Sequence, residues 1–260
     1  MKSILFQTGI GRMFLVLWTG GLLLIAARIG WESKTVVYGS VIVRHGKSCD
    51  YLMYVPPGFH DAEYRYPLLF YLHGSGERNR SVRRLARTGV VHSAGHFAKP
   101  SDFPFLVICP KTDHHVWEPE RVIALLDELL QDDHLRWQID PARIYLTGFS
   151  MGGFGVWSIA AKYPDRFAAI VPVAGGGDTD RVEPLAQLPV WAFHGALDDV
   201  VPCENSVIMI EALRTKYPEM QDKYRLTVYP DLDHGIHLVV YGNIELYRWL
   251  LQHTVVWGDE

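Results

Sequence analysis

The chain has 260 residues, of which 48% are hydrophobic and 21% charged, and its formal net charge at pH 7 is −4. These values are ordinary for a globular protein with one large core, and they exclude the strongly basic footprint of a nucleic-acid-binding protein. Three cysteines, Cys49, Cys109 and Cys203, are too few for a disulfide framework, although one pair could still form in an oxidising compartment. None of them has a metal-ligand neighbourhood, and no metal or other cofactor is predicted.

The first thirty residues differ in kind from the rest of the chain. Lys2 and Arg12 precede an uncharged, mostly apolar run over residues 13–27. This run is short for a membrane-spanning helix and typical of the hydrophobic region of a signal peptide. We therefore predict a signal peptide or membrane anchor over residues 1–30, and a protein that is secreted, periplasmic or anchored facing outside. The alternatives are an apolar terminal helix packed on the core and a wrongly assigned start codon.

Residues 31–260 are predicted to form one α/β domain. Strands are expected near residues 36–44, 49–55, 68–73, 105–109, 143–147, 168–173, 189–194 and 224–229. Helices are expected near residues 81–88, 118–131, 151–163, 203–217 and 240–254. The first two strands read as a hairpin, and an Asp140-Pro141 step predicts a turn before the fifth strand. Because strands alternate with helices from the third strand onward, we expect a mostly parallel central sheet with helices on both faces.

The fifth predicted strand runs directly into Gly148-Phe149-Ser150-Met151-Gly152. This is the G-x-S-x-G spacing in the context of strand, sharp turn and helix, which exposes a serine hydroxyl above a sheet. The two glycines allow the strand and the helix to approach closely. The pattern predicts that Ser150 is a nucleophile; the alternative is a tight turn that happens to contain a small polar residue.

Two carboxylates, Asp198 and Asp199, follow the seventh predicted strand, and two histidines, His234 and His237, follow the eighth. The carboxyl ends of parallel strands meet at one edge of a sheet, so these groups are expected near Ser150. The chain order of serine, acid and histidine is the order of a hydrolase triad. In such a triad the histidine takes the serine proton, and the carboxylate orients the ring and stabilises the imidazolium.

Four segments together resemble the α/β-hydrolase superfamily: residues 72–78 (LHGSGER), 148–153 (GFSMGG), 194–202 (HGALDDVVP) and 233–235 (DHG). The resemblance covers residues 36–254. It is closest to the secreted esterases and predicted peptidases similar to polyhydroxybutyrate depolymerases, feruloyl esterases and dienelactone hydrolases. It implies the α/β-hydrolase fold and favours Asp198 as the acid, because the family's acid is the first carboxylate of H-G-x-x-D-x-x-V-P. His234 is favoured as the base, because a histidine at a loop end fits this role better than His237 at the start of the last helix.

An oxyanion hole requires two backbone N–H donors. One is expected from Met151, the residue after the nucleophile. The resemblance and the expected loop geometry favour Ser75 for the other, with Gly74 as its alternative. Trp117 is a candidate substrate-binding residue that could stack on a sugar or a phenolic ring, or it could simply pack in the core.

A basic cluster follows the predicted oxyanion loop, and its members are Arg78, Arg80, Arg83, Arg84 and Arg87. A solvated helix face is the preferred interpretation, with an anion site as the alternative. Glu77 and Arg78 could pair and hold the loop. His114 and His115 are adjacent in a loop and have no third ligand, so they do not predict a metal site.

The sequence therefore predicts a serine hydrolase that cleaves carboxylic esters through an acyl-enzyme intermediate, acting on small-molecule or polysaccharide-linked esters. The connection over residues 175–184 is short, so no large lid is expected, and an open cleft favours bulky or polymeric esters. A serine peptidase or amidase would use the same triad, and an acyltransferase would transfer the acyl group to an alcohol. A catalytically inactive hydrolase fold that serves as a binding protein is the alternative from a different class.

Overall fold

The computed structural model describes residues 39–59, 64–97 and 99–255, together with the backbone of four short N-terminal strands. Among these strands, β1 (Leu5–Gln7) pairs with β2 (Arg12–Phe14), and β3 (Val16–Trp18) pairs with β4 (Gly21–Leu23). Apart from them, the predicted signal peptide or anchor over residues 1–30 lies outside the described residues. Within the described part of the chain, no helix combines the length and the apolar character needed to cross a membrane.

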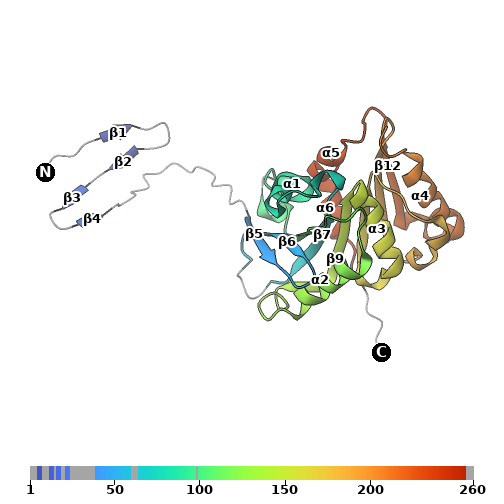
Figure 1. Cartoon of the computed structure of the whole chain (residues 1–260), viewed down its shortest axis with the longest axis horizontal. Helices are drawn as coiled ribbons and strands as arrows, with labels where there is room; N and C mark the ends of the chain where they lie inside the picture. The colour runs from blue at the N-terminus through green and yellow to red at the C-terminus, as the bar shows by residue number, and fades with distance from the viewer. Residues whose placement is uncertain are drawn as a thin grey trace. The chain divides into compact units, whose positions relative to one another are not determined.

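A central sheet of eight strands organises the rest of the chain (Figure 1), in the order β12-β11-β10-β9-β7-β8-β6-β5. Its strands are β5 (Ser40–His45), β6 (Asp50–Val55), β7 (Tyr66–Leu72), β8 (Leu106–Pro110), β9 (Ile139–Phe149), β10 (Ala169–Val173), β11 (Val190–Gly195) and β12 (Tyr224–Tyr229). β6 runs antiparallel to β5 and β8, and all the other neighbours are parallel. The predicted mostly parallel α/β sheet and its eight strands are confirmed.

The turn predicted at Asp140-Pro141 is replaced by an irregularity inside β9. Pairing with β7 skips from Ile139 to Ile144, so the intervening residues leave the regular register. Asp140 accepts a hydrogen bond from the Ala142 amide at 3.0 Å and pairs with Arg143 at 2.6 Å. The side chain of Asp140 thus braces this irregular stretch, and the strand continues through it to the nucleophile.

In the part of the chain that the structure describes, six α-helices flank the sheet: α1 (Gly89–Ala94), α2 (Pro119–Gln131), α3 (Met151–Lys162), α4 (Glu204–Lys216), α5 (His237–Gly242) and α6 (Ile244–Leu250). The helix predicted over residues 81–88 is instead a 3-10 helix, Val82–Arg87, and α1 follows it. The helix predicted over residues 240–254 is two helices. The break lies at Asn243, whose side chain accepts from the Glu245 amide at 3.0 Å and thereby caps α6.

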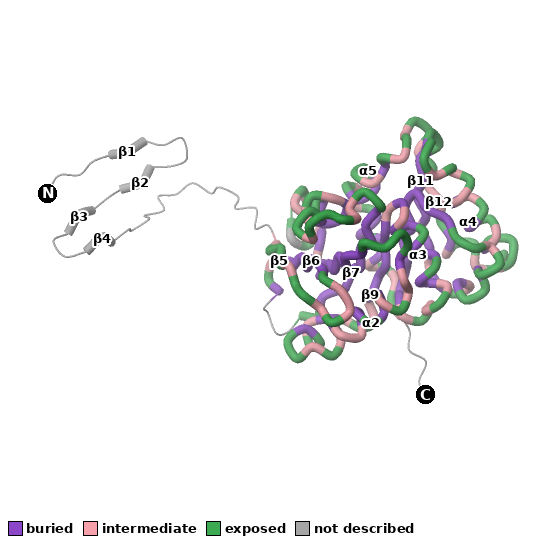
Figure 2. Tube along the Cα trace, viewed as in Figure 1, coloured by how far each residue is buried: buried purple, intermediate pink, exposed green. Residues whose placement is uncertain are grey.

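Two hydrophobic cores lie on opposite faces of the sheet, and the buried backbone runs through the middle of the domain (Figure 2). In β7, Leu68 and Phe70 pack with α2, α3 and α4, whereas Leu69 and Tyr71 pack with α1, α5 and α6. Every residue of β7 is buried, as expected for a central parallel strand covered on both sides. All three cysteines are free thiols, and Cys109 is part of the core.

Candidate active site

Ser150 occupies a strained turn between β9 and α3. Its φ of 57° and ψ of −118° lie in a region that residues other than glycine seldom adopt. The Ser150 amide donates to the Val173 carbonyl at 2.9 Å, which ties the turn to β10. A Cβ on Gly152 would collide with the carbonyl oxygen of Leu72, and one on Gly148 would lie 2.5 Å from the carbonyl oxygen of Gly152. Only glycine at both positions lets β7, β9 and α3 meet this closely.

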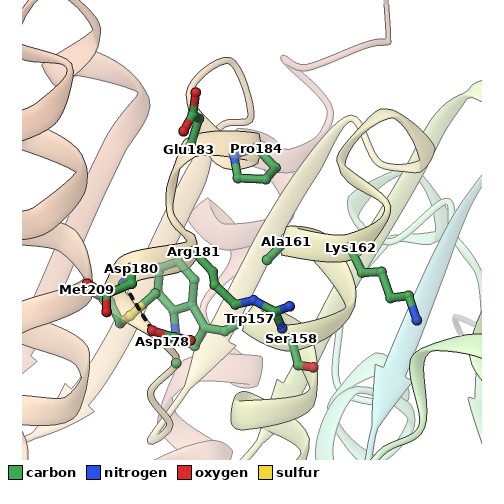
Figure 3. Close-up of a pocket in the computed structure, with 11 residues that line it drawn as sticks. Trp157, Ser158, Ala161, Lys162, Asp178, Asp180, Arg181, Glu183, Pro184 and Met209 are labelled. Carbon is green, nitrogen blue, oxygen red and sulfur yellow. Dashed lines mark hydrogen bonds between the residues drawn. The ribbon is translucent and has the colours of Figure 1, made fainter.

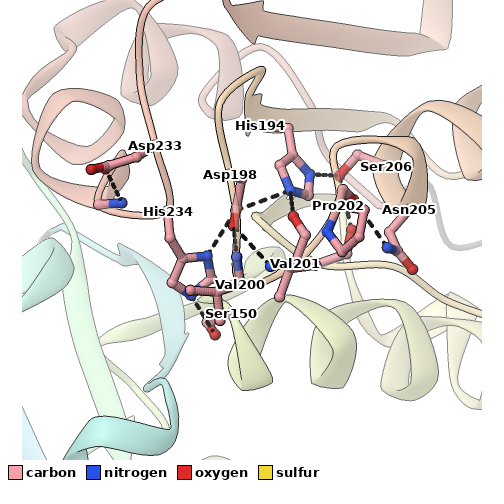
Figure 4. Close-up of polar contacts among 12 residues, drawn as sticks. Ser150, His194, Asp198, Val200, Val201, Pro202, Asn205, Ser206, Asp233 and His234 are labelled. Carbon is pink, nitrogen blue, oxygen red and sulfur yellow. Dashed lines mark hydrogen bonds and ion pairs between the residues drawn. The ribbon is translucent and has the colours of Figure 1, made fainter.

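A hydrogen-bonded row joins Ser150, His234 and Asp198 (Figure 4). His234 Nε2 lies 2.9 Å from Ser150 Oγ, and His234 Nδ1 lies 2.7 Å from Asp198 Oδ2. The other carboxylate oxygen accepts from the amides of Val200 at 3.0 Å and Val201 at 2.8 Å. When Nδ1–H donates to the carboxylate, Nε2 presents a lone pair to the serine hydroxyl, which is the arrangement of a general base beside a nucleophile.

The electrostatics around Asp198 favour its ionised form. Burial raises the pKa of this carboxyl, but hydrogen bonds from His234, Val201 and Val200 outweigh burial and leave the pKa below its usual value. Asp199, the other candidate acid, is exposed to solvent. The structure therefore places Asp198 rather than its neighbour against the histidine.

A second histidine, which the sequence pattern did not single out, contacts the same carboxylate. His194, at the end of β11, is fully buried, and its Nε2 lies 3.2 Å from Asp198 Oδ2 and 2.9 Å from the Val201 carbonyl oxygen. Its Nδ1 lies 2.7 Å from Ser206 Oγ, and the Ser206 hydroxyl donates to the Gly175 carbonyl at 2.8 Å. This network ties the acid-bearing loop to α4 and to the end of β10. His194 is the histidine of the H-G-x-x-D motif, and this motif was the sequence signal that could have identified it.

His237, the alternative base, opens α5 and has no hydrogen bond to Ser150 in the described part of the chain. Its ring contacts Phe149 at a centroid distance of 4.6 Å, and Phe149 also contacts His234 at 4.9 Å. Burial lowers the pKa of His237, and the nearby His234 and His92 lower it further. His237 is therefore a largely uncharged packing partner at neutral pH, and the structure brings His234 to the serine instead.

The two amides predicted to form an oxyanion hole both lie at the first position of a helix. Ser75 opens the 3-10 helix Ser75–Glu77 after β7, and Met151 opens α3. Over residues 39–59, 64–97 and 99–255, neither of these backbone N–H groups donates to a carbonyl or side-chain acceptor. First-turn amides have no partner inside their own helix, so both donors are free to bind an oxygen anion.

The loop after β8 holds the Ser75 loop in place. The Thr112 amide donates to His73 Nε2 at 3.2 Å, and Trp117 Nε1 donates to the His73 carbonyl at 3.1 Å. The Asn79 amide donates to Asp113 Oδ1 at 2.8 Å. Burial lowers the pKa of His73 to about 4, so its ring is neutral at physiological pH and can accept the Thr112 hydrogen bond. His73 thus has a packed position from which it orients the loop.

Arg78 does not form the suggested pair with Glu77 in the described residues. Its Nε donates to the Ser75 carbonyl at 3.3 Å, and its guanidinium contacts His115 Nδ1. His114 pairs with Glu118 at 3.3 Å. Among the described residues, no group of three histidine, cysteine, aspartate or glutamate side chains could hold a metal ion. The rest of the basic cluster is exposed, as predicted for a solvated face, and consists of Arg80, Arg83, Arg84 and Arg87.

Trp117 is 6% exposed, so most of its surface is packed, and its ring contacts His73 edge-on at 4.9 Å. Its remaining surface forms one wall of a cavity of about 420 Å³ next to the nucleophile turn, which we call the proximal pocket. This pocket is lined by His115, Val116, Trp117, Met151, Phe154, Gly155 and Ser158. The tryptophan therefore both packs and borders a cavity beside the serine.

An eight-stranded, mostly parallel sheet with a serine at the strand-to-helix turn after β9 places the chain in the α/β-hydrolase fold class. Within that class, the profile of the Dienelactone hydrolase family matches residues 111–238. A crystal structure of a thermostable esterase superposes on 84% of this chain and 64% of its own, with a TM-score of 0.67 and 28% identity.

Two relatives by sequence are also described as esterases. "Putative esterase NocK" of Nocardia uniformis subsp. tsuyamanensis is 28% identical over 63% of this chain and 49% of its own length. "Bifunctional acetylxylan esterase/xylanase XynS20E" of Neocallimastix patriciarum is 24% identical over 56% of this chain and 21% of its own. The aligned part of this chain thus spans about half of the first relative and about a fifth of the second.

Proposed function

We propose that this protein hydrolyses carboxylic esters, with Ser150 as nucleophile, His234 as general base and Asp198 as the acid that orients it. The row of hydrogen bonds from Ser150 Oγ through His234 to Asp198 is the observation that carries the proposal. The esterase descriptions of the relatives support the choice of an ester bond. An inactive hydrolase fold used for binding would have no need to keep all three groups within hydrogen-bonding distance.

The reaction follows from the geometry. Ser150 Oγ attacks the carbonyl carbon while His234 Nε2 takes its proton, and the amides of Met151 and Ser75 stabilise the oxyanion. Collapse of the tetrahedral intermediate breaks the bond to the alkoxide, which leaves as an alcohol after receiving the proton from His234. Water then attacks the acyl-enzyme with His234 as base, releasing the carboxylic acid and free Ser150. The Asp198 carboxylate stabilises the imidazolium in both halves of the reaction.

The surroundings of the serine support bulky esters. The proximal pocket, with Trp117, Phe154 and Val116 among its walls, offers an aromatic and aliphatic surface to an acyl group or a phenolic ring. Large apolar side chains are also exposed on the loop that carries the acid, where Leu197 is 61% and Val200 is 64% exposed. The acetylxylan esterase relative supports esters linked to a polysaccharide. Residues 1–30 would direct such an enzyme to substrates outside the cell, as a cleaved signal peptide or an anchor.

The test is hydrolysis by the wild type, by Ser150→Ala and by Ser101→Ala, a control at an exposed serine outside the site. The substrates are p-nitrophenyl acetate, butyrate and octanoate, methyl ferulate, and a p-nitroanilide amide. We expect ester hydrolysis and fluorophosphonate labelling that both disappear in Ser150→Ala and persist in Ser101→Ala. Turnover of the anilide alone would indicate a peptidase or amidase. Absence of both turnover and labelling in the wild type would contradict catalysis and support a binding role.

A further inference from the structure

A second cavity of about 530 Å³ lies along the C-terminal half of α3, outside the residues that form the site (Figure 3). We call it the distal pocket. It is lined by Trp157, Ser158, Ala161, Lys162, Gly177, Asp178, Asp180, Arg181, Glu183, Pro184 and Met209. These residues come from α3, from the connection between β10 and β11, and from α4.

Trp157, one of the residues that line the distal pocket, carries a polar group without a partner among the described residues. Trp157 is only 1% exposed, and its indole Nε1 has no hydrogen-bond acceptor among the described residues. A buried donor left unpaired is destabilising, so an acceptor from a bound molecule that reached it would be stabilising here. At Gly177, an added Cβ would lie 2.9 Å from Trp157 Cβ and 3.0 Å from Met209 Cε. Gly177 therefore packs closely against both side chains, and a larger residue would not fit there.

The walls of the distal pocket combine both signs of charge. Asp178, Asp180 and Glu183 supply carboxylate acceptors, and Arg181 and Lys162 supply donors. Arg181 has no ion pair among the described residues, and Figure 3 shows it extending across the pocket toward α3. Lys162 already pairs with Glu120, and Glu183 with Lys216. An anionic ligand would meet three carboxylates, and a purely apolar ligand would leave Arg181 without a partner. A neutral molecule with many hydroxyl groups satisfies both, because each hydroxyl donates and accepts.

The distal pocket adjoins the proximal pocket, since Ser158 lines both of them. Along α3, Ser158 lies eight residues beyond Ser150, a rise of about 12 Å at 1.5 Å per residue. A molecule attached at the serine could therefore pass over Phe154 and Ser158 and reach Arg181. That path suits an extended substrate better than a small ester, which would fill the proximal pocket alone.

We propose that the distal pocket is a carbohydrate subsite, which binds the neutral glycan part of a polysaccharide-linked ester while Ser150 attacks the ester carbonyl. This proposal rests on the esterase function proposed above. The Trp157 N–H donates to a sugar oxygen, Arg181 closes over the glycan from the opposite side, and the carboxylates accept from its hydroxyl groups.

Binding is tested first, without turnover. Full-length Ser150→Ala protein is titrated with xylotetraose, cellotetraose and mannotetraose while the indole N–H resonances are followed by NMR, and the Trp157 resonance is assigned with Trp157→Phe. We expect at least one tetrasaccharide to shift the Trp157 resonance, and the shift to disappear in Arg181→Ala. Arg248→Ala, at an exposed and ion-paired arginine on α6, is the control and should leave the shift unchanged. If none of the glycans moves this resonance, the subsite is overturned.

Kinetics provide the second readout. For Arg181→Ala and Trp157→Phe we expect KM for an acetylated xylo-oligosaccharide to rise about five- to tenfold, the effect of losing one or two hydrogen bonds. Their kcat, and their kinetics on p-nitrophenyl acetate, should match the wild type. Equal losses on both esters would show that the pocket is only structural and would overturn the subsite. If the wild type cleaves neither ester, the esterase proposal fails, and the NMR titration still decides the subsite.

Discussion

The carboxylate of Asp198 receives hydrogen bonds from two backbone amides and from His234, and they hold its pKa below the usual value despite burial. A carboxyl with a depressed pKa in the folded state contributes stability above its unfolded pKa, near 3.9, and loses that contribution as the pH falls through the folded pKa. We expect Asp198→Asn to lower the melting temperature at pH 7, and the difference from the wild type to shrink as the pH is lowered below about 4. The measurement is thermal unfolding between pH 7 and pH 3.

Asp199→Asn is the matched control, because this neighbouring carboxylate is exposed. It should change the melting temperature little at any pH. Equal pH dependence in the two variants would show that the hydrogen bonds at Asp198 do not stabilise the fold.

His194 contacts the same carboxylate from the side opposite the reaction and ties it to Ser206. We expect His194→Gln to lower kcat/KM on p-nitrophenyl acetate by about 10- to 100-fold, since small misplacements of a catalytic group are this costly. Ser206→Ala should act in the same direction with a smaller loss, because the two bonds that it removes, to His194 Nδ1 and to the Gly175 carbonyl, do not involve the Asp198 carboxylate itself. Circular dichroism checks the fold of both variants. Wild-type kinetics in a folded His194→Gln protein would mean that the loop is held by other contacts.

At the scale of elements, the meeting of β7 with the start of α3 depends on Gly152, where a Cβ would collide with a backbone carbonyl. We expect Gly152→Ala to lower the free energy of unfolding by about 1–3 kcal/mol and to reduce activity, because α3 must shift away from the strand. Gly76→Ala is the matched control, since an added Cβ there has no neighbour within 4 Å. Urea unfolding of both variants measures the difference. Equal effects would show that the close approach does not matter.

The elements that sequence predicts well are those whose signals are local. The strands on either side of Ser150 and the helix after it follow from apolar runs and glycine spacing, and they are present as expected. The break at Asn243 was missed because apolar periodicity continues across it, although the capping asparagine marks it. The H-G-x-x-D motif marks His194, but its contact with Ser206 could not be predicted, because it forms only once α4 packs beside β11.

At the scale of the molecule, the strand ends at one edge of the sheet bring together groups from widely separated parts of the chain. Ser75 follows β7, the loop with Trp117 follows β8, Ser150 follows β9, Asp198 follows β11 and His234 follows β12. This is where an open parallel sheet places its ligands. The distal pocket extends this edge down the flank of α3, so a long substrate would contact the molecule along a helix as well as at the strand ends.

The predicted signal peptide or anchor over residues 1–30 decides in which compartment the protein would encounter such a substrate. Residues 1–36 and 37–260 separate into two units by their internal contacts. The unit of residues 37–260 should therefore fold without residues 1–36. We expect a protein of residues 37–260 to keep the melting temperature and ester kinetics of the full chain.

We also expect residues 1–36 to give reporter activity when they are fused to a reporter that is active only outside the cytoplasm. A fusion with Leu15 and Leu17 changed to Asp should give no activity, because charge in the apolar run blocks export. An inactive wild-type fusion would contradict the signal or anchor.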